Sequence, residues 1–287
     1  MPHDPVSSGA APFLAACVQM RSGVDRARNV ADAGALIAEE ASRGAKLVVT
    51  PEMTNVLDRD AARLFAHLPE ESALEEVEAF AAMARAHRLW LLVGSMAVKT
   101  GARRAANRSF LYAPDGEIVA RYDKLHMFDV HLPNGESWKE SAVYQPGAGA
   151  GAVDTPPARP GPTLCYDARF PPLYRALAQA GAEVLCVPAA FTRQTGEAHW
   201  KTLLTARAIE NGAFVLAAAQ GGLHEDGRAT YGHSLAIGPW GEILAEAEND
   251  APGVVLAEID PARAHAARAR IPNLGLERAI KVLTIKP

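Results

Sequence analysis

A cysteine stands where a short apolar segment meets a turn and a helix. The short apolar segment, residues 161–165, ends at Cys165. Pro171-Pro172 then opens a segment with apolar residues at helical spacing, from Leu173 to Gly181. Proline is tolerated in the first helical turn, because its missing N–H has no partner within the helix. The pattern predicts a strand, a sharp turn and a helix whose N-terminus could stabilise a thiolate or an oxyanion. This stretch alone is equally compatible with a buried, inert cysteine.

Three charged residues stand after predicted strands or turns elsewhere in the chain. Glu52 follows the apolar run 48–51, Lys124 lies just past a predicted hairpin, and Glu140 lies in a charged loop. Each can be read as an ordinary surface residue. Ligands, however, bind where the carboxyl ends of parallel strands meet. A thiol with a pKa of about 8.5 is mostly protonated at neutral pH, so a catalytic Cys165 needs such a base or cation beside it.

The elements that must position these residues alternate between strands and helices. In the first half, the apolar periodicity predicts strands over 13–20, 46–50 and 89–94, helices over 25–43 and 71–88, and a hairpin of 109–112 with 117–122. In the second half, it predicts strands over 163–166, 183–188 and 214–219, helices over 173–180 and 199–211, and a hairpin of 234–237 with 242–247. The order of elements therefore repeats.

Both predicted hairpins contain the pattern Pro-x-Gly-Glu-Ile, at residues 114–118 and 239–243. The repeat predicts an α/β protein with internal pseudo-two-fold symmetry, in which two mixed sheets pack face to face in a four-layer α-β-β-α sandwich. We expect one domain over 12–287 after a disordered tail over 1–11. Two separate domains would need a flexible linker, and its one candidate, 145–162, runs straight into the strand before Cys165.

Composition narrows the class of protein. The chain has 287 residues, 49% hydrophobic and 22% charged, with a net charge of −4, which suits a soluble globular protein. No basic run favours nucleic acid, and no apolar run is long enough to span a membrane. The first residues lack the pattern of a secretion signal. Three cysteines cannot form a closed disulfide set, so we expect a cytoplasmic protein.

Several motifs resemble those of one known family. Cys-Tyr-Asp-x-Arg-Phe-Pro at 165–171, Pro-Glu at 51–52 and Tyr-Asp-Lys-x-His at 122–126 are similar to the nitrilase superfamily of carbon–nitrogen hydrolases. Residues 190–211 and 231–242 resemble the branch that holds ω-amidases and deaminated-glutathione amidases. Many motifs in the same order from about 13 to about 260 are far more specific than a single short match.

The resemblance implies a four-layer sandwich and a cysteine amidase without metal or other cofactor. Cys165 matches the family's nucleophile, Glu52 its general base, Lys124 its oxyanion-stabilising lysine, and Glu140 a second glutamate near that lysine. The backbone N–H of Tyr166 would complete the oxyanion site. The implied reaction is hydrolysis of a terminal amide through a thioester, with release of ammonia or an amine. The family also implies a homodimer or a larger homo-oligomer.

Two stretches depart from the family pattern. An extra proline lies in 156–162, before the nucleophile, and the tail over 271–278 fits the usual ending poorly. Carbamoylases and nitrilases share the same triad, so they remain alternatives to an amidase. A metal-dependent hydrolase would have to use His126, Asp129 and His131, whose spacing matches no common ligand pattern.

The substrate can be narrowed by its charge. Arg169 lies four residues after Cys165, where it could hold a carboxylate bidentately. A structural ion pair with Asp167 or another acid is the alternative. Phe191 and Thr195, in the loop predicted after the strand over 183–188, would form the opposite wall. These residues predict a small substrate that carries a carboxylate, such as deaminated glutathione or α-ketoglutaramate.

Overall fold

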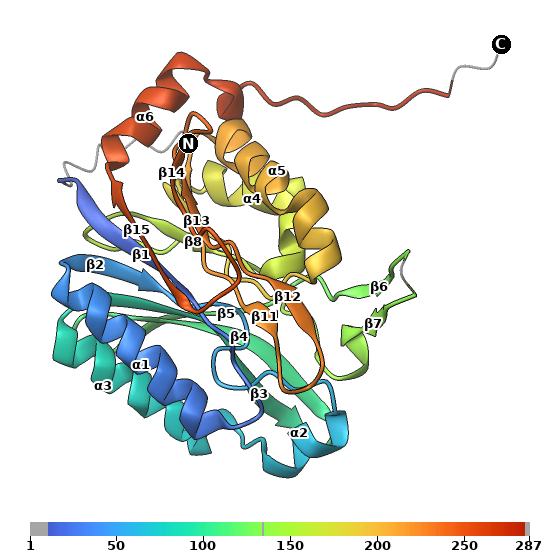
Figure 1. Ribbon diagram of the computed structural model, residues 1–287. Helices are drawn as coiled ribbons and strands as arrows, with labels where there is room; N and C mark the ends of the chain where they lie inside the picture. The colour runs from blue at the N-terminus through green and yellow to red at the C-terminus, as the bar shows by residue number, and fades with distance from the viewer. Residues whose placement is uncertain (1–10, 134, 285–287) are drawn as a thin grey trace.

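Two sheets pack face to face in the computed structural model, which describes residues 11–133 and 135–284 (Figure 1). The predicted tail over 1–11 lies almost entirely outside the described residues. The first sheet has the spatial order β15-β1-β2-β3-β4-β5, with bounds Gly253–Ile259, Phe13–Gln19, Ala45–Val49, Trp90–Gly101, Arg104–Tyr112 and Ile118–Asp123. The second has the order β14-β13-β10-β9-β8, with bounds Ile243–Glu246, Leu235–Ile237, Phe214–Ala217, Val184–Cys186 and Pro160–Pro162.

The two sheets repeat one pattern of strand directions. In the first, β1, β2 and β3 run parallel and β4 and β5 follow antiparallel. In the second, β8, β9 and β10 run parallel and β13 and β14 follow antiparallel. The predicted mixed sheets and internal repeat are therefore confirmed.

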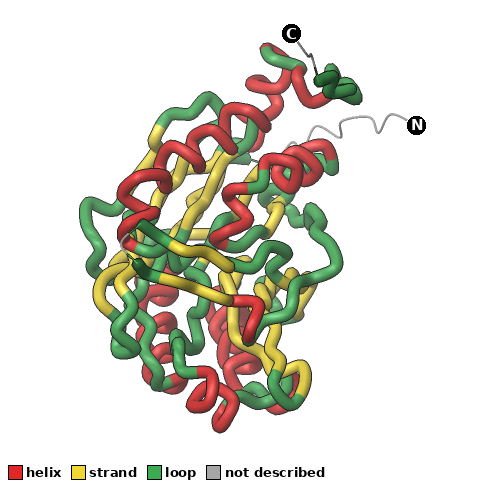
Figure 2. Tube along the Cα trace, turned by 90° about the vertical axis from the view of Figure 1, so that its right-hand side faces the viewer, coloured by secondary structure: helices red, strands yellow, loops and turns green. Residues whose placement is uncertain are grey.

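Helices cover the outer face of each sheet. In Figure 1, α1 (Arg26–Ser42) and α3 (Glu75–His87) lie outside the first sheet, and α4 (Pro171–Gln179) and α5 (Arg193–Asn211) lie outside the second. In Figure 2, the side of the molecule that carries α4 and α5 faces the viewer, with strands behind its helices. The remaining helices, α2 (Ala61–His67) and α6 (Pro261–Arg270), lie outside these layers. This is the predicted four-layer sandwich.

Three apolar layers hold the sandwich together. Alternate residues of β10 show the division, because Phe214 and Leu216 join the core between the sheets, whereas Val215 and Ala217 pack under α4 and α5. Strand residues buried on both faces read as continuous apolar runs. Cys17 and Cys186 lie fully buried in the core between the sheets, as their apolar strands predict.

The sheets approach closely at one glycine. A Cβ at Gly94, in β3, would lie 2.1 Å from the carbonyl oxygen of Thr50 and 2.5 Å from Cβ of Pro188. Any larger residue would push the first sheet away from the segment that follows β9. Glycine is therefore required where the strands lead into the predicted site.

Several element boundaries differ from the predictions. Helix α5 begins at Arg193, six residues before the predicted start, and the predicted helix over 71–88 divides into a 3₁₀ turn, Glu71–Ala73, and α3. The predicted strand over 163–166 is wrong, because β8 ends at Pro162 and Cys165 opens a 3₁₀ turn, Cys165–Arg169. Since β8 is an edge strand, its prolines cost no hydrogen bond on the open side.

Two small hairpins, a C-terminal turn and an extended end complete the described chain. The hairpins are β6–β7 (Asp129–His131 and Ser137–Lys139) and β11–β12 (Gly221–Leu223 and Ala229–Tyr231), and short 3₁₀ turns occur at Glu140–Ala142 and Asn273–Gly275. Residues 277–284 have no regular structure and lead away from the body in Figure 1. Within 11–133 and 135–284, none of the helices is both long and apolar enough to cross a membrane.

Candidate active site

Glu52 lies in the loop that leaves the carboxyl end of β2. Its side chain is buried, and nitrogen donors of three residues fix the carboxylate. Oε1 accepts hydrogen bonds from Nζ of Lys124 and Nδ2 of Asn107, both at 2.8 Å, and Oε2 accepts one from the N–H of Ala190 at 2.9 Å. Asn107 belongs to β4 and Ala190 follows β9, so elements of both halves hold this one carboxylate.

Lys124 lies between two carboxylates. It follows β5, and its side chain is 2% exposed. Besides Glu52, its Nζ donates to both carboxylate oxygens of Glu140, at 3.0 and 2.9 Å. Glu140 also accepts a bond from the N–H of Phe128 at 2.6 Å. The cation cannot leave without stranding the buried charge of Glu52 and the largely buried charge of Glu140, so its position is strongly determined.

Cys165 occupies an unusual backbone conformation. Its φ angle is 47°, in the left-handed region that residues other than glycine rarely adopt. Its N–H donates to the carbonyl oxygen of Pro188 at 2.8 Å, which ties the turn to the end of β9. Strain of this kind persists only where the surroundings impose it, and it gathers at functional sites. The turn after Cys165 leaves the N–H of Tyr166 in the first turn of a short 3₁₀ helix, where such groups lack helical partners.

Burial and charge set the protonation states at this site. Burial raises the pKa of Glu52, but the charge of Lys124 and hydrogen bonds from Lys124, Cys165 and Asn107 outweigh it, and the pKa lies below its ordinary value. Burial alone would lower the pKa of Lys124, yet Glu140 and Glu52 hold it well above the usual range. Burial and the charge of Glu52 raise the pKa of Cys165 well above 9.0. The resting site therefore holds a neutral thiol beside an ionised base.

All four residues line one cavity of about 250 Å³. Tyr166, Phe191 and Thr195 also line it, and Thr195 lies in the first turn of α5 and not in the predicted loop. The cavity therefore brings together a thiol, a carboxylate base and a buried cation. This set can support attack on a carbonyl carbon and stabilise the negative oxygen that results.

Arg169 contacts the cavity wall without belonging to it. Its guanidinium lies 5.9 Å from the ring centre of Tyr166 and 5.4 Å from that of Phe191. Its other neighbour is Nδ1 of His199, at 3.3 Å. The alternative, an ion pair with Asp167, is not among the ion pairs of the described residues. A role for Arg169 in binding a carboxylate stays a prediction.

The three residues of the alternative metal site have separate partners. His126 bonds to Asp167 through Nδ1 at 2.7 Å, Asp129 accepts from Ser141, and His131 bonds to Ser137. Across 11–133 and 135–284, no three His, Cys, Asp or Glu side chains are placed to hold a metal ion.

The site also contains Asn107 and Arg228, which were not predicted from the sequence. Asn107 bonds to both Glu52 and Glu140, the latter at 3.2 Å, and Arg228 lines the same cavity. A single polar residue inside a strand or a short hairpin carries no pattern that separates it from a surface residue. Only the fold places these two beside the motif residues.

Comparison with known proteins decides the family. The sequence profile described as carbon-nitrogen hydrolase matches residues 14–269. The chain belongs to the carbon–nitrogen hydrolase family. This carbon–nitrogen hydrolase is 41% identical to the deaminated glutathione amidase of Synechocystis over 267 aligned residues. The alignment covers 92% of this chain and 97% of the relative. It is 40% identical over 259 residues to the human deaminated glutathione amidase, covering 88% of this chain and 78% of the relative.

Solved structures agree with the fold of this carbon–nitrogen hydrolase. The NitFhit protein of Caenorhabditis elegans has a TM-score of 0.86 and 34% identity over 94% of this chain and 66% of its own. Nit3 of Saccharomyces cerevisiae, a member of branch 10 of the nitrilase superfamily, has a TM-score of 0.81 and 26% identity over 91% of this chain and 94% of its own. The predicted nitrilase-like fold and the predicted amidase class are confirmed.

Proposed function

We propose that this enzyme hydrolyses the amide of a small carboxylate-bearing substrate of the deaminated-glutathione type, with Cys165 as its nucleophile. One observation carries the proposal: Nζ of Lys124 lies 2.8 Å from Glu52 and 2.9 Å from Glu140 in the cavity that Cys165 lines. A base, a cation and a thiol in one cavity suit acyl transfer. The names of the relatives supply the substrate type.

The first half of the reaction forms a thioester. Glu52 takes the proton of the Cys165 thiol as sulfur attacks the carbonyl carbon. Lys124 and the N–H of Tyr166 hold the oxyanion, and one such donor is typically worth about 10²–10³ in rate. Glu52 then returns the proton to the nitrogen as the C–N bond breaks, and ammonia or an amine leaves.

The second half releases the acid. Glu52, ionised again, takes a proton from water, which attacks the thioester carbonyl. The Cys165–carbon bond breaks, and the thiol regains its proton from Glu52. Glu140 keeps Lys124 charged and in place throughout, and it does not exchange protons with the substrate.

A panel of amides tests this function. With ammonia and amine detection in the presence of EDTA, we expect turnover of deaminated glutathione and α-ketoglutaramate and little turnover of nitriles or N-carbamoyl amino acids. Arg169→Met should raise KM for α-ketoglutaramate far more than for its methyl ester, because the guanidinium can bind only the free carboxylate bidentately. Hydrolysis confined to a carbamoyl substrate would contradict the proposal.

We also propose that the enzyme works in the cytoplasm as a homodimer or larger homo-oligomer. Ile280 and Val282, each 87% exposed in the C-terminal segment, support an interface that covers them. Three unpaired cysteines suit a reducing compartment. Light scattering of the full chain measures the assembly, and a monomer at micromolar concentration would contradict it.

A further inference from the structure

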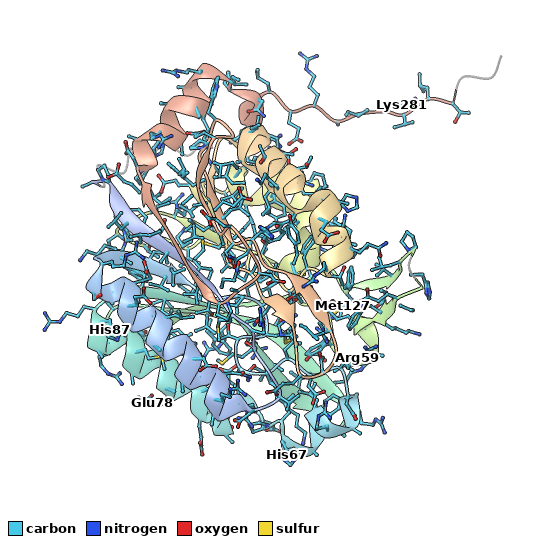
Figure 3. The ribbon with its side chains drawn as sticks, in the orientation of Figure 1. Arg59, His67, Glu78, His87, Met127 and Lys281 are labelled. Atoms are coloured by element: carbon cyan, nitrogen blue, oxygen red, sulfur yellow. The ribbon has the colours of Figure 1, made fainter. Side chains whose placement is uncertain are left out.

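The cavity has a second group of charged lining residues, which the proposed reaction does not use. Arg59, Trp138 and Arg228 line the same cavity as Cys165, but they come from three separate segments. Arg59 ends the loop that begins at Glu52, Trp138 lies in β7, and Arg228 precedes β12. Figure 3 shows Arg59 on the side of the molecule that carries the β6–β7 hairpin.

Both guanidinium groups lie against one indole. The ring centre of Trp138 is 4.6 Å from Cζ of Arg228 and 5.2 Å from Cζ of Arg59. Such contacts restrict flexible side chains and orient their donors. Trp138 is itself held, because its Nε1 donates to Glu136 at 2.7 Å.

A buried aspartate joins the two arginine segments. Oδ2 of Asp226 accepts the N–H of Arg59 at 2.9 Å and lies 3.4 Å from the guanidinium of Arg228. Its Oδ1 accepts the N–H of Arg228 at 2.9 Å. The Asp226 side chain is fully buried, so the two loops are fixed relative to each other.

The arginines have more donors than their neighbours accept. Nε of Arg228 is buried and has no hydrogen-bond partner among the described residues. The guanidinium of Arg59 makes no ion pair within 11–133 and 135–284, and the adjacent Asp58 is bonded to Arg63 at 2.6 and 2.7 Å. Unsatisfied guanidinium donors in a cavity favour a carboxylate, whose two oxygens match their fork.

The position of these arginines indicates which half of the substrate they meet. Glu52, Asp58 and Arg59 line the cavity from one loop, 52–59, whereas Tyr166, Phe191 and Thr195 line it from the nucleophile's half of the chain. In the proposed reaction, Glu52 protonates the departing nitrogen. We therefore infer that the amine half of the substrate lies toward this loop, which also carries Arg59.

We propose that Arg59 and Arg228, held on Trp138, form a subsite for a carboxylate on the amine half of the substrate. This inference rests on the proposed function and narrows it: the preferred substrate is an N-substituted amide that releases an acidic amine, and a primary amide that releases ammonia uses only part of the cavity. Deaminated glutathione, with a terminal carboxylate on its departing dipeptide, has this chemistry.

Three matched substrates test the subsite: deaminated glutathione, the same molecule with its terminal carboxylate converted to a carboxamide, and α-ketoglutaramate. For the wild type, we expect kcat/KM to be about 10- to 100-fold lower for the carboxamide, the size of a lost charge-assisted hydrogen bond. Arg59→Met and Arg228→Met should lower kcat/KM for the acid by a similar factor, through KM, and change the other two substrates less than twofold. The matched control is Arg85→Met, an exposed arginine of α3 paired with Glu78 at 2.9 Å, which should change none of them.

Each outcome has one meaning. If the wild type hydrolyses none of the three substrates, the proposed function is wrong. If it hydrolyses the acid and its carboxamide equally well, or if both variants affect all three substrates alike, the function stands and the subsite is wrong. Arg59 is exposed, so Arg59→Met keeps the test valid even if Arg228→Met does not fold.

Discussion

The hydroxyl of Tyr122 donates a hydrogen bond to Oδ2 of Asp167 at 2.6 Å, across the interface between the two sheets. The same carboxylate accepts the N–H of Leu164 at 2.9 Å, and its Oδ1 bonds to the backbone N–H and Nδ1 of His126. Asp167 thus joins the segment that carries Lys124 to the turn that carries Cys165. This buried carboxylate therefore contributes to the relative position of cation and nucleophile.

Replacement of this carboxylate should affect both stability and rate. Asp167→Asn keeps the shape but loses the charge and turns one acceptor into a donor. We expect a loss of about 3 kcal/mol in the free energy of unfolding, typical of a broken buried network, measured by urea titration. kcat should fall by at least tenfold with KM little changed. Tyr122→Phe, which removes one bond, is the milder control. Equal kcat in all three proteins would contradict the positioning role.

The three cysteines should respond differently to alanine. Cys165→Ala should abolish turnover, to background in an ammonia assay, and leave the melting temperature nearly unchanged. Cys17→Ala and Cys186→Ala should keep kcat, because both thiols are buried between the sheets, where burial raises the pKa of Cys186 to about 12. Each should lose about 1–2 kcal/mol of stability to the cavity left behind. Appreciable activity in Cys165→Ala would rule out the mechanism.

The ionised groups of the site should act as a unit. Glu52→Gln removes the base and keeps its shape, and Lys124→Met removes the cation. Each should lower kcat by about 10²–10⁴, and the double variant should lose little more than the worse single one. Lys124→Met should in addition destabilise the fold by about 3–5 kcal/mol, because it strands the buried carboxylate of Glu52 and the largely buried one of Glu140. Additive losses in the logarithm of kcat would show that the two groups act independently.

The acid limb of the pH profile should report Glu52. The reaction needs this carboxylate ionised, and its pKa lies below the ordinary 4.5. We therefore expect kcat/KM to stay level from pH 8 down to pH 5 and to fall only below pH 4.5. The stability that the lowered pKa confers is present above pH 4.5 and is lost as the pH falls through the folded-state value.

Asn107→Ala provides the matched test of that limb. Loss of its bond to Glu52 removes one of the contacts that lower the pKa, so the limb should move to higher pH. Thr205→Ala, a half-buried position in α5 outside the cavity lining, should leave it in place. An unmoved limb in Asn107→Ala would mean that another group controls it.

The sequence predicts the sandwich because its signals are local. Strands such as β1 and β10 are apolar on both faces, α1 begins at the capping residue Asp25, and the two Pro-x-Gly-Glu-Ile hairpins mark the repeat. The strand β15 was not predicted. Its partner β1 lies more than two hundred residues away in the chain, and the residues around β15 do not indicate which strand it pairs with. Long-range strand pairing leaves only weak local signals.

The residues of the site also differ in how well the sequence predicts them. Glu52, Lys124 and Cys165 stand in motifs, and the structure brings them into one cavity. Asn107 and Arg228 are single polar residues whose importance comes from what the fold places beside them. The predicted helix over 199–211 leaves Thr195 in a loop, but α5 begins at Arg193, and the bond between Thr192 and Thr195 lies across its first turn.

The first sheet is completed by β15, a strand more than two hundred residues after β1 in the chain. Seven residues of β15 pair with β1, from Phe13 opposite Ile259 to Gln19 opposite Gly253. During synthesis, β1 leaves the ribosome long before this partner, and one edge of its sheet stays open meanwhile. Closing so long a loop costs little more entropy than closing one of half its length. The separation of the two strands therefore delays folding but hardly lowers the stability of the folded protein. The sheet that carries Glu52 and Lys124 can therefore gain its edge strand, residues 253–259, only after the segment with Cys165 has been made.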